Sequence, residues 1–229
     1  ISEGLGHYKG DRFAAIASAT GTNEDNYLLQ KFARVGMGSN NVDHASNIRP
    51  ELVHGLGSIV DYQAGTNTIW ELEKSKCILT VSTNTTEEHN VLAIPIKKAA
   101  KGGATIIVID PREVELTRYA KLWLRNRPGT ESVLLGGILR AIFDLALENK
   151  EFLDERCNNL EALKTSLVEF SVEKVAKETG VPEHQILEAA RLYSEGPSSI
   201  VYALDNVPQA EHSSCVHAIA DLALVTGNI

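Results

Sequence analysis

Two short polar segments hold the residues whose types could do chemistry. The first, residues 82–90, is Ser-Thr-Asn-Thr-Thr-Glu-Glu-His-Asn, and the second, residues 110–112, is Asp-Pro-Arg. Asparagine, threonine and acidic side chains accept hydrogen bonds from sugar hydroxyls and base amino groups, and backbone N–H groups of such loops hold phosphate. A carboxylate beside a guanidinium suits a ribose or a guanine edge. The residue types favour a nucleotide site, although no G-x-G-x-x-G of a standard NAD site is present.

The second segment also has an explanation that needs no ligand. Asp110 would cap the helix that follows it, and Arg112 would pair with a surface carboxylate. The spacing of the residues leaves both explanations open.

Each polar segment follows an apolar run of the length of a buried strand. The runs are residues 77–81 and 104–109, and a helical pattern between them covers residues 91–100 before Gly102 and Gly103. This order predicts a βαβ unit with two parallel strands, buried on both faces. Because parallel strands end at the same edge of a sheet, we expect the two polar segments to lie side by side there.

Strands and helices alternate along the rest of the chain as well. Further strands are expected at residues 13–17, 122–124 and 199–204, and the main further helices at residues 22–35, 131–149, 183–195 and 211–225. Residues 39–44 are expected to form a polar turn. The predicted fold class is α/β, with a doubly wound, mostly parallel sheet and helices on both of its faces.

Charge and hydropathy argue against several classes of protein. The chain of 229 residues has a formal charge of −8, which argues against an electrostatic nucleic-acid surface. No apolar run has the length of about 18–20 residues that a membrane span requires, and no signal peptide is apparent. We therefore expect a cytoplasmic protein that binds no nucleic acid and crosses no membrane.

The cysteines and histidines show no metal-binding pattern. Cys77, Cys157 and Cys215 lie far apart without a C-x-x-C, and the seven histidines include no H-E-x-x-H. The sequence predicts three reduced thiols and no structural zinc site.

Four stretches resemble the catalytic subunit of molybdopterin-dependent formate dehydrogenases, within the wider molybdopterin oxidoreductase family. They are TNEDNYLLQKFARVGMGSNNVDH at residues 22–44, TNTTEEH at 83–89, GGATIIVIDPREVELTRYAKLWLRNRPGTE at 102–131 and LALVTGNI at 222–229. They span nearly the whole chain in the order of the family, and this combination is far more specific than any one of them.

The resemblance implies that the chain is the interior of a longer subunit, with the central α/β domains of formate dehydrogenases and DMSO reductases. Residues 1–45 would belong to a first central α/β domain, and residues 46–229 would form a second, dinucleotide-binding-like domain. The second domain would hold one guanosine end of a bis-molybdopterin guanine dinucleotide that carries molybdenum or tungsten. The iron–sulfur cysteines of the family have no counterpart in this segment.

The nucleotide motifs of the family match eight residues of this chain. They are Asn84, Glu87, Glu88, Asp110, Arg112, Gly129, Thr130 and Glu131. The first three match the loop near the guanosine and the pyrophosphate, and Asp110 and Arg112 match the D-P-R at the nucleotide. The last three match the family's G-T-D, whose acid is expected to hydrogen-bond the guanine. Glu131 is one methylene longer than the usual aspartate, so its reach differs.

The chain departs from the family at the reaction centre. After Asn-Asn-Val-Asp-His the family has C-A-R-x-C-H or its selenocysteine form, in which the last Cys ligates the metal and the His is the catalytic neighbour. Here the ligand position falls on Ile48 or Arg49, and the His position on Arg49 or Pro50. Neither Ile nor Arg is a credible metal ligand, and Pro cannot carry a proton. The sequence therefore predicts no catalytic residue and no metal ligand.

A second departure follows the last predicted strand. Asp205, Asn206 and Pro208 stand where the family often has small and Gln residues near the cofactor. The cofactor contact of that loop is therefore not carried over to this chain.

Three hypotheses remain open. In the first, the chain is part of a formate dehydrogenase-like oxidoreductase, whose partners are the remaining domains of the parent subunit and redox partner subunits. In the second, it belongs to a non-catalytic member of the family, a structural or electron-transfer subunit of an NADH dehydrogenase-like complex. In the third, it is an unrelated small-molecule-binding α/β module. Apolar surface left by absent domains would make the isolated segment self-associate.

Overall fold

A computed structural model describes residues 2–18, 21–44, 57–60 and 65–229. The chain divides into two units, Ile1–Pro50 and Glu51–Ile229, and each unit is described by itself. Positions 48–50, where the family's metal ligand and histidine are expected, lie outside the described residues.

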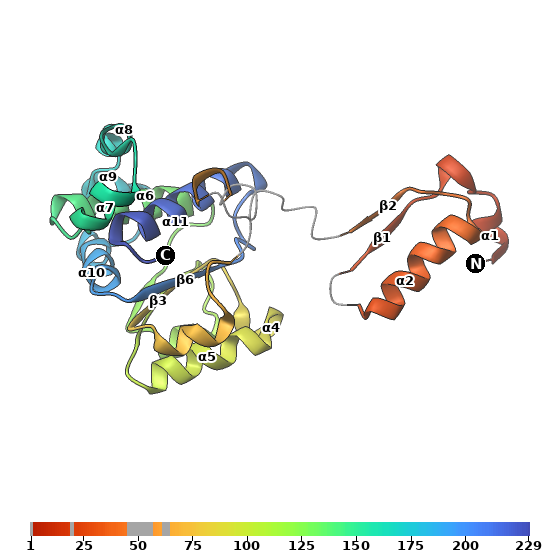
Figure 1. Ribbon diagram of the computed structural model, residues 1–229, viewed down its shortest axis with the longest axis horizontal. Coiled ribbons are helices and arrows are strands. Elements are labelled where there is room, and N and C mark those ends of the chain that lie inside the picture. The colour runs from red at the N-terminus through yellow and green to blue at the C-terminus, as the bar shows by residue number, and fades with distance from the viewer. Residues whose placement is uncertain (1, 19–20, 45–56, 61–64) are drawn as a thin grey trace. The chain divides into compact units, whose positions relative to one another are not determined.

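The first unit is built on a two-stranded parallel sheet (Figure 1). Its elements in chain order are α1 (Ser2–Gly6), η1 (Gly10–Arg12), β1 (Ala15–Ala17), α2 (Asn23–Lys31), the π-helical turn η2 (Phe32–Gly36) and β2 (Val42–His44). Strand β2 corrects the expectation of a polar turn over residues 39–44. Its backbone pairs with β1 from Ala15–Val42 to Ala17–His44. The side chains of residues 39–44 are largely polar, so the strand forms because its backbone is paired with β1.

The second unit is organised around a four-stranded parallel sheet in the order β5-β4-β3-β6. The strands are β3 (Cys77–Val81), β4 (Thr105–Ile109), β5 (Leu122–Leu124) and β6 (Ser198–Tyr202). The predicted βαβ unit is confirmed, because β3 pairs in parallel with β4 and α5 (Asn90–Lys101) joins them. All the pairings are parallel, so the four strands end at one edge of the sheet.

Helices cover both faces of this sheet, which confirms the predicted α/β class (Figure 1). Successive side chains of a strand point to opposite faces. Ile78 and Ile106 accordingly pack with Ile96 of α5 on one face. Their neighbours Leu79 and Ile107 belong to the larger core on the other face. That core includes residues of α6 (Glu131–Asp144), α10 (Glu183–Ser194) and α11 (His212–Thr226).

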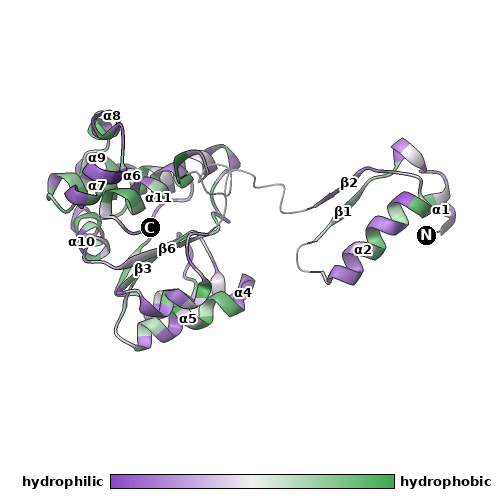
Figure 2. Ribbon diagram, viewed as in Figure 1, coloured by the Kyte–Doolittle hydropathy of each residue, from purple (hydrophilic) through white to green (hydrophobic). Residues whose placement is uncertain are grey.

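The remaining helices of the second unit are short. They include η4 (Ile69–Lys74), α4 (Thr85–Glu88), η5 (Glu115–Tyr119), α7 (Lys150–Arg156), α8 (Leu160–Ser166), η6 (Leu167–Glu169), α9 (Val172–Thr179) and η7 (Gln209–Glu211). Hydrophilic and hydrophobic residues alternate along α5, as expected for a helix with one face on the sheet (Figure 2). Helix α6 ends at Asp144, short of the expected residue 149, and Ala146 beyond it has a left-handed φ of 54°. Among the described residues, no helix is long and apolar enough to cross a membrane.

Two of the three cysteines are buried in the core of the second unit. Cys77 lies in β3 and Cys215 in α11, and burial raises the pKa of each thiol to about 12. Cys157 is half-buried, and burial is also the main cause of its raised pKa. All three are free thiols, as predicted.

The raised thiol pKa values predict that the second unit loses stability at alkaline pH. An unburied thiol has a pKa of 9.0, whereas Cys77 and Cys215 keep their protons to about pH 12. Between these values the folded state holds more protons than the unfolded state, so the free energy of unfolding falls as the pH rises. We expect a fall of up to about 1.4 kcal/mol per pH unit for each thiol.

Urea unfolding measured between about pH 9 and pH 11 tests this expectation. A double variant with Cys77→Ala and Cys215→Ala should show a shallower loss of stability with pH than the unchanged chain. The difference in slope is the readout, because tyrosines and lysines titrate in the same range in both proteins. Identical slopes would contradict the prediction.

Candidate functional site

The loops that follow β3, β4 and β6 meet at Ser82. The Ser82 N–H donates to the Ile109 carbonyl at 2.8 Å, and the Ser82 carbonyl accepts from the Asp205 N–H at 3.0 Å. Ser82 has a φ of 42° and Leu204 a φ of 57°. Such left-handed backbone costs a residue with a side chain about 1–3 kcal/mol and is typical of functional sites. These three loops and the turn after β5 form one polar edge, which we call the carboxyl edge. The sequence predicted that two of these segments, residues 82–90 and 110–112, lie side by side here.

Asp110 lies at the carboxyl edge with its carboxylate buried, its side chain being 1% exposed. The carboxylate accepts from the backbone N–H of Arg112 at 2.8 Å and from Nε and Nη2 of that residue at 3.2 and 3.3 Å. The side-chain amide of Asn206 donates to both oxygens at 3.4 and 3.5 Å. Arg112 thus pairs with Asp110 itself, an arrangement that needs no ligand.

Arg112 keeps an outer face in solvent, its side chain being 43% exposed. The hydrogen bond to Asp110 raises the pKa of Arg112, partial burial opposes this shift, and the charges of Asp110, Asp205 and Glu88 add to it. The guanidinium is therefore a permanent cation among three carboxylates, with its charge already balanced inside the protein.

The aromatic ring of Trp123 supports the loop of Asp110 from the neighbouring strand. Its Nε1 donates to the Asp110 carbonyl at 2.9 Å. Arg125 lies over the Trp123 ring, 5.4 Å from its centroid, and its Nε donates to the Pro111 carbonyl at 3.3 Å. The ends of β4 and β5 are thereby held together.

A tight turn after β5 leads into α6. The Thr130 N–H donates to the Arg127 carbonyl at 3.2 Å, and the Thr130 hydroxyl donates to the same carbonyl at 2.7 Å. Pro128 and Gly129 occupy the middle of this turn, and Gly129 has the positive φ, 80°, that the second middle position of a type II turn requires. The turn places Glu131 at the first position of α6.

Glu131 is completely buried at the carboxyl edge. Its Oε1 accepts from the Ser82 hydroxyl at 3.4 Å, and its Oε2 has no hydrogen-bond partner among the described residues. The partial positive charge of the α6 N-terminus favours a carboxylate at this position. An unsatisfied buried acceptor costs about 1–3 kcal/mol, so a hydrogen-bond donor that reached Oε2 would stabilise this region.

Other buried polar atoms without a protein partner lie in the same loops. In the part of the chain that the structure describes, they are Thr83 Oγ1, Thr85 Oγ1 and Asn126 Oδ1. Buried polar groups in native proteins are nearly always hydrogen-bonded, to protein or to another molecule. A polar ligand or ordered water at the carboxyl edge would supply these partners.

The three residues predicted after β3 lie in and before the short helix α4. Asn84 precedes this helix, is half-buried and accepts from the Thr86 hydroxyl at 3.1 Å. Glu87 and Glu88 are exposed on α4. All three follow β3 directly and so belong to the carboxyl edge.

The structure thus gathers residues that lie far apart in the sequence, and it adds three that sequence reasoning did not select. These are Ser82, which contacts Glu131, Asn126 in the turn after β5, and Asn206, which contacts Asp110. Asn206 had been noted only as a departure from the family. Asn206 follows the last apolar strand, which ends at the same edge of the sheet, so its position in the sequence could have marked it as a residue of this site.

The described residues contain no group of three or more His, Cys, Asp and Glu side chains that could hold a metal ion. What the carboxyl edge offers is hydrogen-bond acceptors, chiefly the Glu131 carboxylate, and the exposed face of Arg112. This arrangement can bind and orient a polar ligand.

A model of the molybdopterin oxidoreductase family matches residues 5–229, so the chain belongs to that family. Within it, the chain resembles formate dehydrogenase alpha subunits. It is 38% identical, over 232 residues, to the F420-dependent formate dehydrogenase subunit alpha of Methanocaldococcus jannaschii, covering 100% of this chain and 34% of the relative. A putative formate dehydrogenase of Staphylococcus haemolyticus is 37% identical over 224 residues, covering 96% of this chain and 23% of the relative. The chain spans about a third or less of the length of these relatives.

Acetylene hydratase from Pelobacter acetylenicus has a similar fold. The TM-score is 0.71 at 23% sequence identity, and the match covers 100% of this chain and 32% of that chain. This similarity confirms the α/β fold of the chain.

Replacing Asp110 tests how the carboxyl edge is held together. Asp110→Asn should destabilise the second unit by about 2–4 kcal/mol, because an amide cannot accept all the bonds of Arg112 and leaves its charge unbalanced. The matched control is Asp144→Asn, since Asp144 accepts from Arg140 at 2.8 Å on the exposed face of α6. Such a surface pair contributes about 1 kcal/mol or less.

Urea unfolding followed by tryptophan fluorescence measures both variants, because both tryptophans of the chain lie in the second unit. A loss of stability for Asp110→Asn no larger than that of the control would contradict this account of the edge.

Proposed function

We propose that this chain contributes the nucleotide-binding domain of a formate dehydrogenase-like molybdopterin oxidoreductase. Residues 46–229 would hold one guanosine end of a bis-molybdopterin guanine dinucleotide, and residues 1–45 would belong to a neighbouring α/β domain. The observation that carries the proposal is the completely buried carboxylate of Glu131, whose Oε2 lacks a donor among the described residues.

A guanine edge fits this carboxylate. Guanine presents a ring N–H and an amino group side by side, and one carboxylate accepts from both in a charge-assisted pair. Glu131 Oε2 is buried without a hydrogen-bond partner among the described residues, and Oε1 has only the long 3.4 Å bond to Ser82. Glu131 is one methylene longer than the family's aspartate, and its carboxylate contacts the Ser82 hydroxyl just after β3.

The other predicted residues would border the same ligand. Gly129 and Thr130 form the turn that presents Glu131. Arg112, held by Asp110, would offer the exposed face of its guanidinium to the nucleotide. Asn84, Glu87 and Glu88 would line the side that follows β3.

When bound, the molybdenum or tungsten cofactor supplies the redox chemistry of the reaction. The described residues of this chain would bind and orient its nucleotide end. The family membership and the formate dehydrogenase names of relatives support formate as the substrate of the whole protein.

A second candidate function is favoured by the residues at positions 48–50. Isoleucine, arginine and proline stand where the family has a metal-ligating Cys and a His. A non-catalytic member of the family, serving as a structural or electron-transfer subunit of an NADH dehydrogenase-like complex, would keep the nucleotide edge without these residues.

The proposed partners are the remaining domains of the parent subunit and redox partner subunits, in the cytoplasm. In the first unit the side chains of Ile16, Tyr27, Leu28 and Val35 are exposed. Apolar surface of this kind supports contact with other domains, and self-association of the chain when it is isolated. The name of the Methanocaldococcus relative, a subunit alpha, also supports partner subunits.

Analysis of the complete protein, purified anaerobically, tests the proposal. Molybdenum, tungsten, pterin and the guanine released by acid would each be measured. We expect metal, pterin and guanine in a fixed ratio. Pterin without guanine would contradict the nucleotide-binding role. Pterin and guanine without metal would favour the non-catalytic member of the family.

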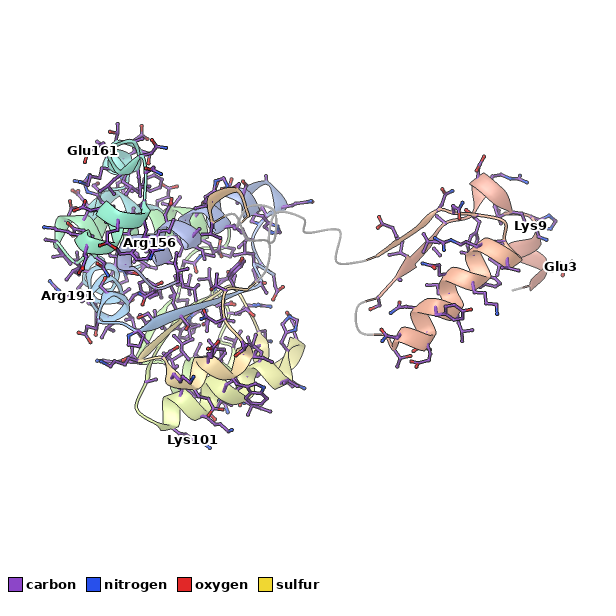
Figure 3. All side chains as sticks on the ribbon, in the orientation of Figure 1. Glu3, Lys9, Lys101, Arg156, Glu161 and Arg191 are labelled. Carbon is purple, nitrogen blue, oxygen red and sulfur yellow. The ribbon has the colours of Figure 1, made fainter. Side chains whose placement is uncertain are left out.

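The variant Glu131→Gln shows whether this domain holds the nucleotide. Losing a charged acceptor costs about 1.5–3 kcal/mol, so retained cofactor should fall about tenfold or more. The control is Glu161→Gln on α8, whose side chain is labelled in Figure 3 and is 86% exposed. Equal cofactor content in the two variants would contradict the role of Glu131.

A further inference from the structure

A pocket of about 240 Å³ lies between α7, the start of α8 and the last two turns of α11, three helices that lie beside one another in Figure 1. None of the residues proposed to bind a nucleotide lines it. Most of the lining is apolar, namely Leu153, Leu160, Ala162, Leu163, Leu224 and Val225, and Cys157, Asn158, Asn159 and Asp221 complete it. An apolar lining with a few polar groups is the usual character of a small-molecule site.

The Asp221 carboxylate lines this pocket without a counter-ion. The residue is half-buried, and burial raises the pKa of its carboxyl group. The charge of His217, one turn earlier in α11, opposes this shift. In the part of the chain that the structure describes, the carboxylate accepts no hydrogen bond and forms no ion pair. A partly buried negative charge in this condition favours a ligand that brings a cation.

The neighbouring cations do not fill this role. Lys164 of α8 donates to Glu161 at 3.0 Å and lies over the ring of Phe143. Arg156, at the end of α7, is exposed and does not line the pocket. The charge that faces the pocket therefore remains that of Asp221.

Helix α11 adds negative character of its own. The C-terminal end of a helix carries partial negative charge, which a basic residue in the last turn usually complements. The last turn of α11 has no basic residue, and Leu224 and Val225 of that turn line the pocket. The side-chain amide oxygens of Asn158 and Asn159 are further acceptors in the lining. An apolar surface and several acceptors thus meet in one small space.

We propose that this pocket binds a primary ammonium group on a short apolar stem, with the ammonium at Asp221 and the stem among the leucines. An ammonium has three N–H donors and no acceptor, which matches the carboxylate and the two asparagine amides. Pockets for drug-sized ligands measure about 300–1,000 Å³, so this smaller one suits a stem of a few carbon atoms. The site is separate from the carboxyl edge and does not depend on the proposed nucleotide binding.

Saturation-transfer NMR of the ligand, with the complete protein, tests the inference. n-Pentylamine and 1-pentanol would be titrated separately in about 0.2 M salt, which screens the general attraction of a cation to an acidic protein. We expect pentylamine to bind about tenfold more tightly, because the alcohol lacks the charge that pairs with the carboxylate. Equal affinities, or no binding of the amine, would overturn the inference.

The variant Asp221→Asn locates the site. It removes the charge and keeps the shape of the side chain, so the affinity for pentylamine should fall about tenfold while that for pentanol stays the same. The matched control is Asp154→Asn, because Asp154 is exposed on α7 and does not line the pocket. It should change neither affinity. Equal losses in the two variants would assign the binding to overall charge and overturn the site.

Urea unfolding without ligand separates a binding role of Asp221 from a structural one. Because the carboxyl pKa is raised by burial, the ionised form does not stabilise the fold at neutral pH. Asp221→Asn should therefore be at least as stable as the unchanged chain. A clear loss of stability would show that the carboxylate serves the fold, and would overturn the inference.

A fourth ligand distinguishes two sources of the ammonium group. Nα-acetyl-lysinamide presents the same group on a peptide backbone. If it binds more tightly than pentylamine, the pocket takes a lysine side chain of a partner protein. If it binds more weakly, the pocket takes a free amine.

Discussion

The carboxyl edge depends on the hydrogen bonds of one residue, Ser82. Its N–H bonds the end of β4, its carbonyl accepts from the loop after β6, and its hydroxyl donates to Glu131 at the start of α6. Ser82 makes these bonds in a left-handed backbone conformation, with a φ of 42°. A residue with a side chain adopts this conformation at a cost of about 1–3 kcal/mol, which the surrounding contacts must offset. The arrangement of the carboxyl edge thus depends on hydrogen bonds of three loops and of α6 to Ser82.

Two buried carboxylates at this edge serve different purposes. Asp110 has donors from Arg112 and Asn206 on both oxygens, so its burial is compensated inside the protein. Glu131 has one long hydrogen bond and one open oxygen. A buried charge without a hydrogen-bond donor lowers the stability of the folded protein, and a ligand that supplies the donor would recover this free energy on binding. The first carboxylate therefore organises the loops, while the second is suited to recognition.

Sequence reasoning predicted the central βαβ unit and the placement of the Asp-Pro-Arg segment at a strand end, because long apolar runs and turn residues are local signals. It could not predict which of the two carboxylates would be satisfied internally, since Asn206 lies 96 positions from Asp110 and reaches it only through the sheet order. Strand β2 was missed for a similar reason: its side chains give no apolar signal, and pairing with β1 alone makes it a strand. Contacts between segments distant in the sequence decided each of these points.

The residues proposed to bind a nucleotide and the positions of the family's metal ligand lie in separate parts of the sequence. The groups that would bind a nucleoside come from the ends of β3, β4 and β5, whereas the positions at which the family ligates its metal, residues 48–50, belong to another part of the sequence. A family member can therefore keep the edge with its cofactor and change or lose the chemistry at the metal. Conversely, measurements on the carboxyl edge test the proposed cofactor binding and do not test catalysis by the whole protein, because the family places its metal-ligating Cys and its His at positions 48–50.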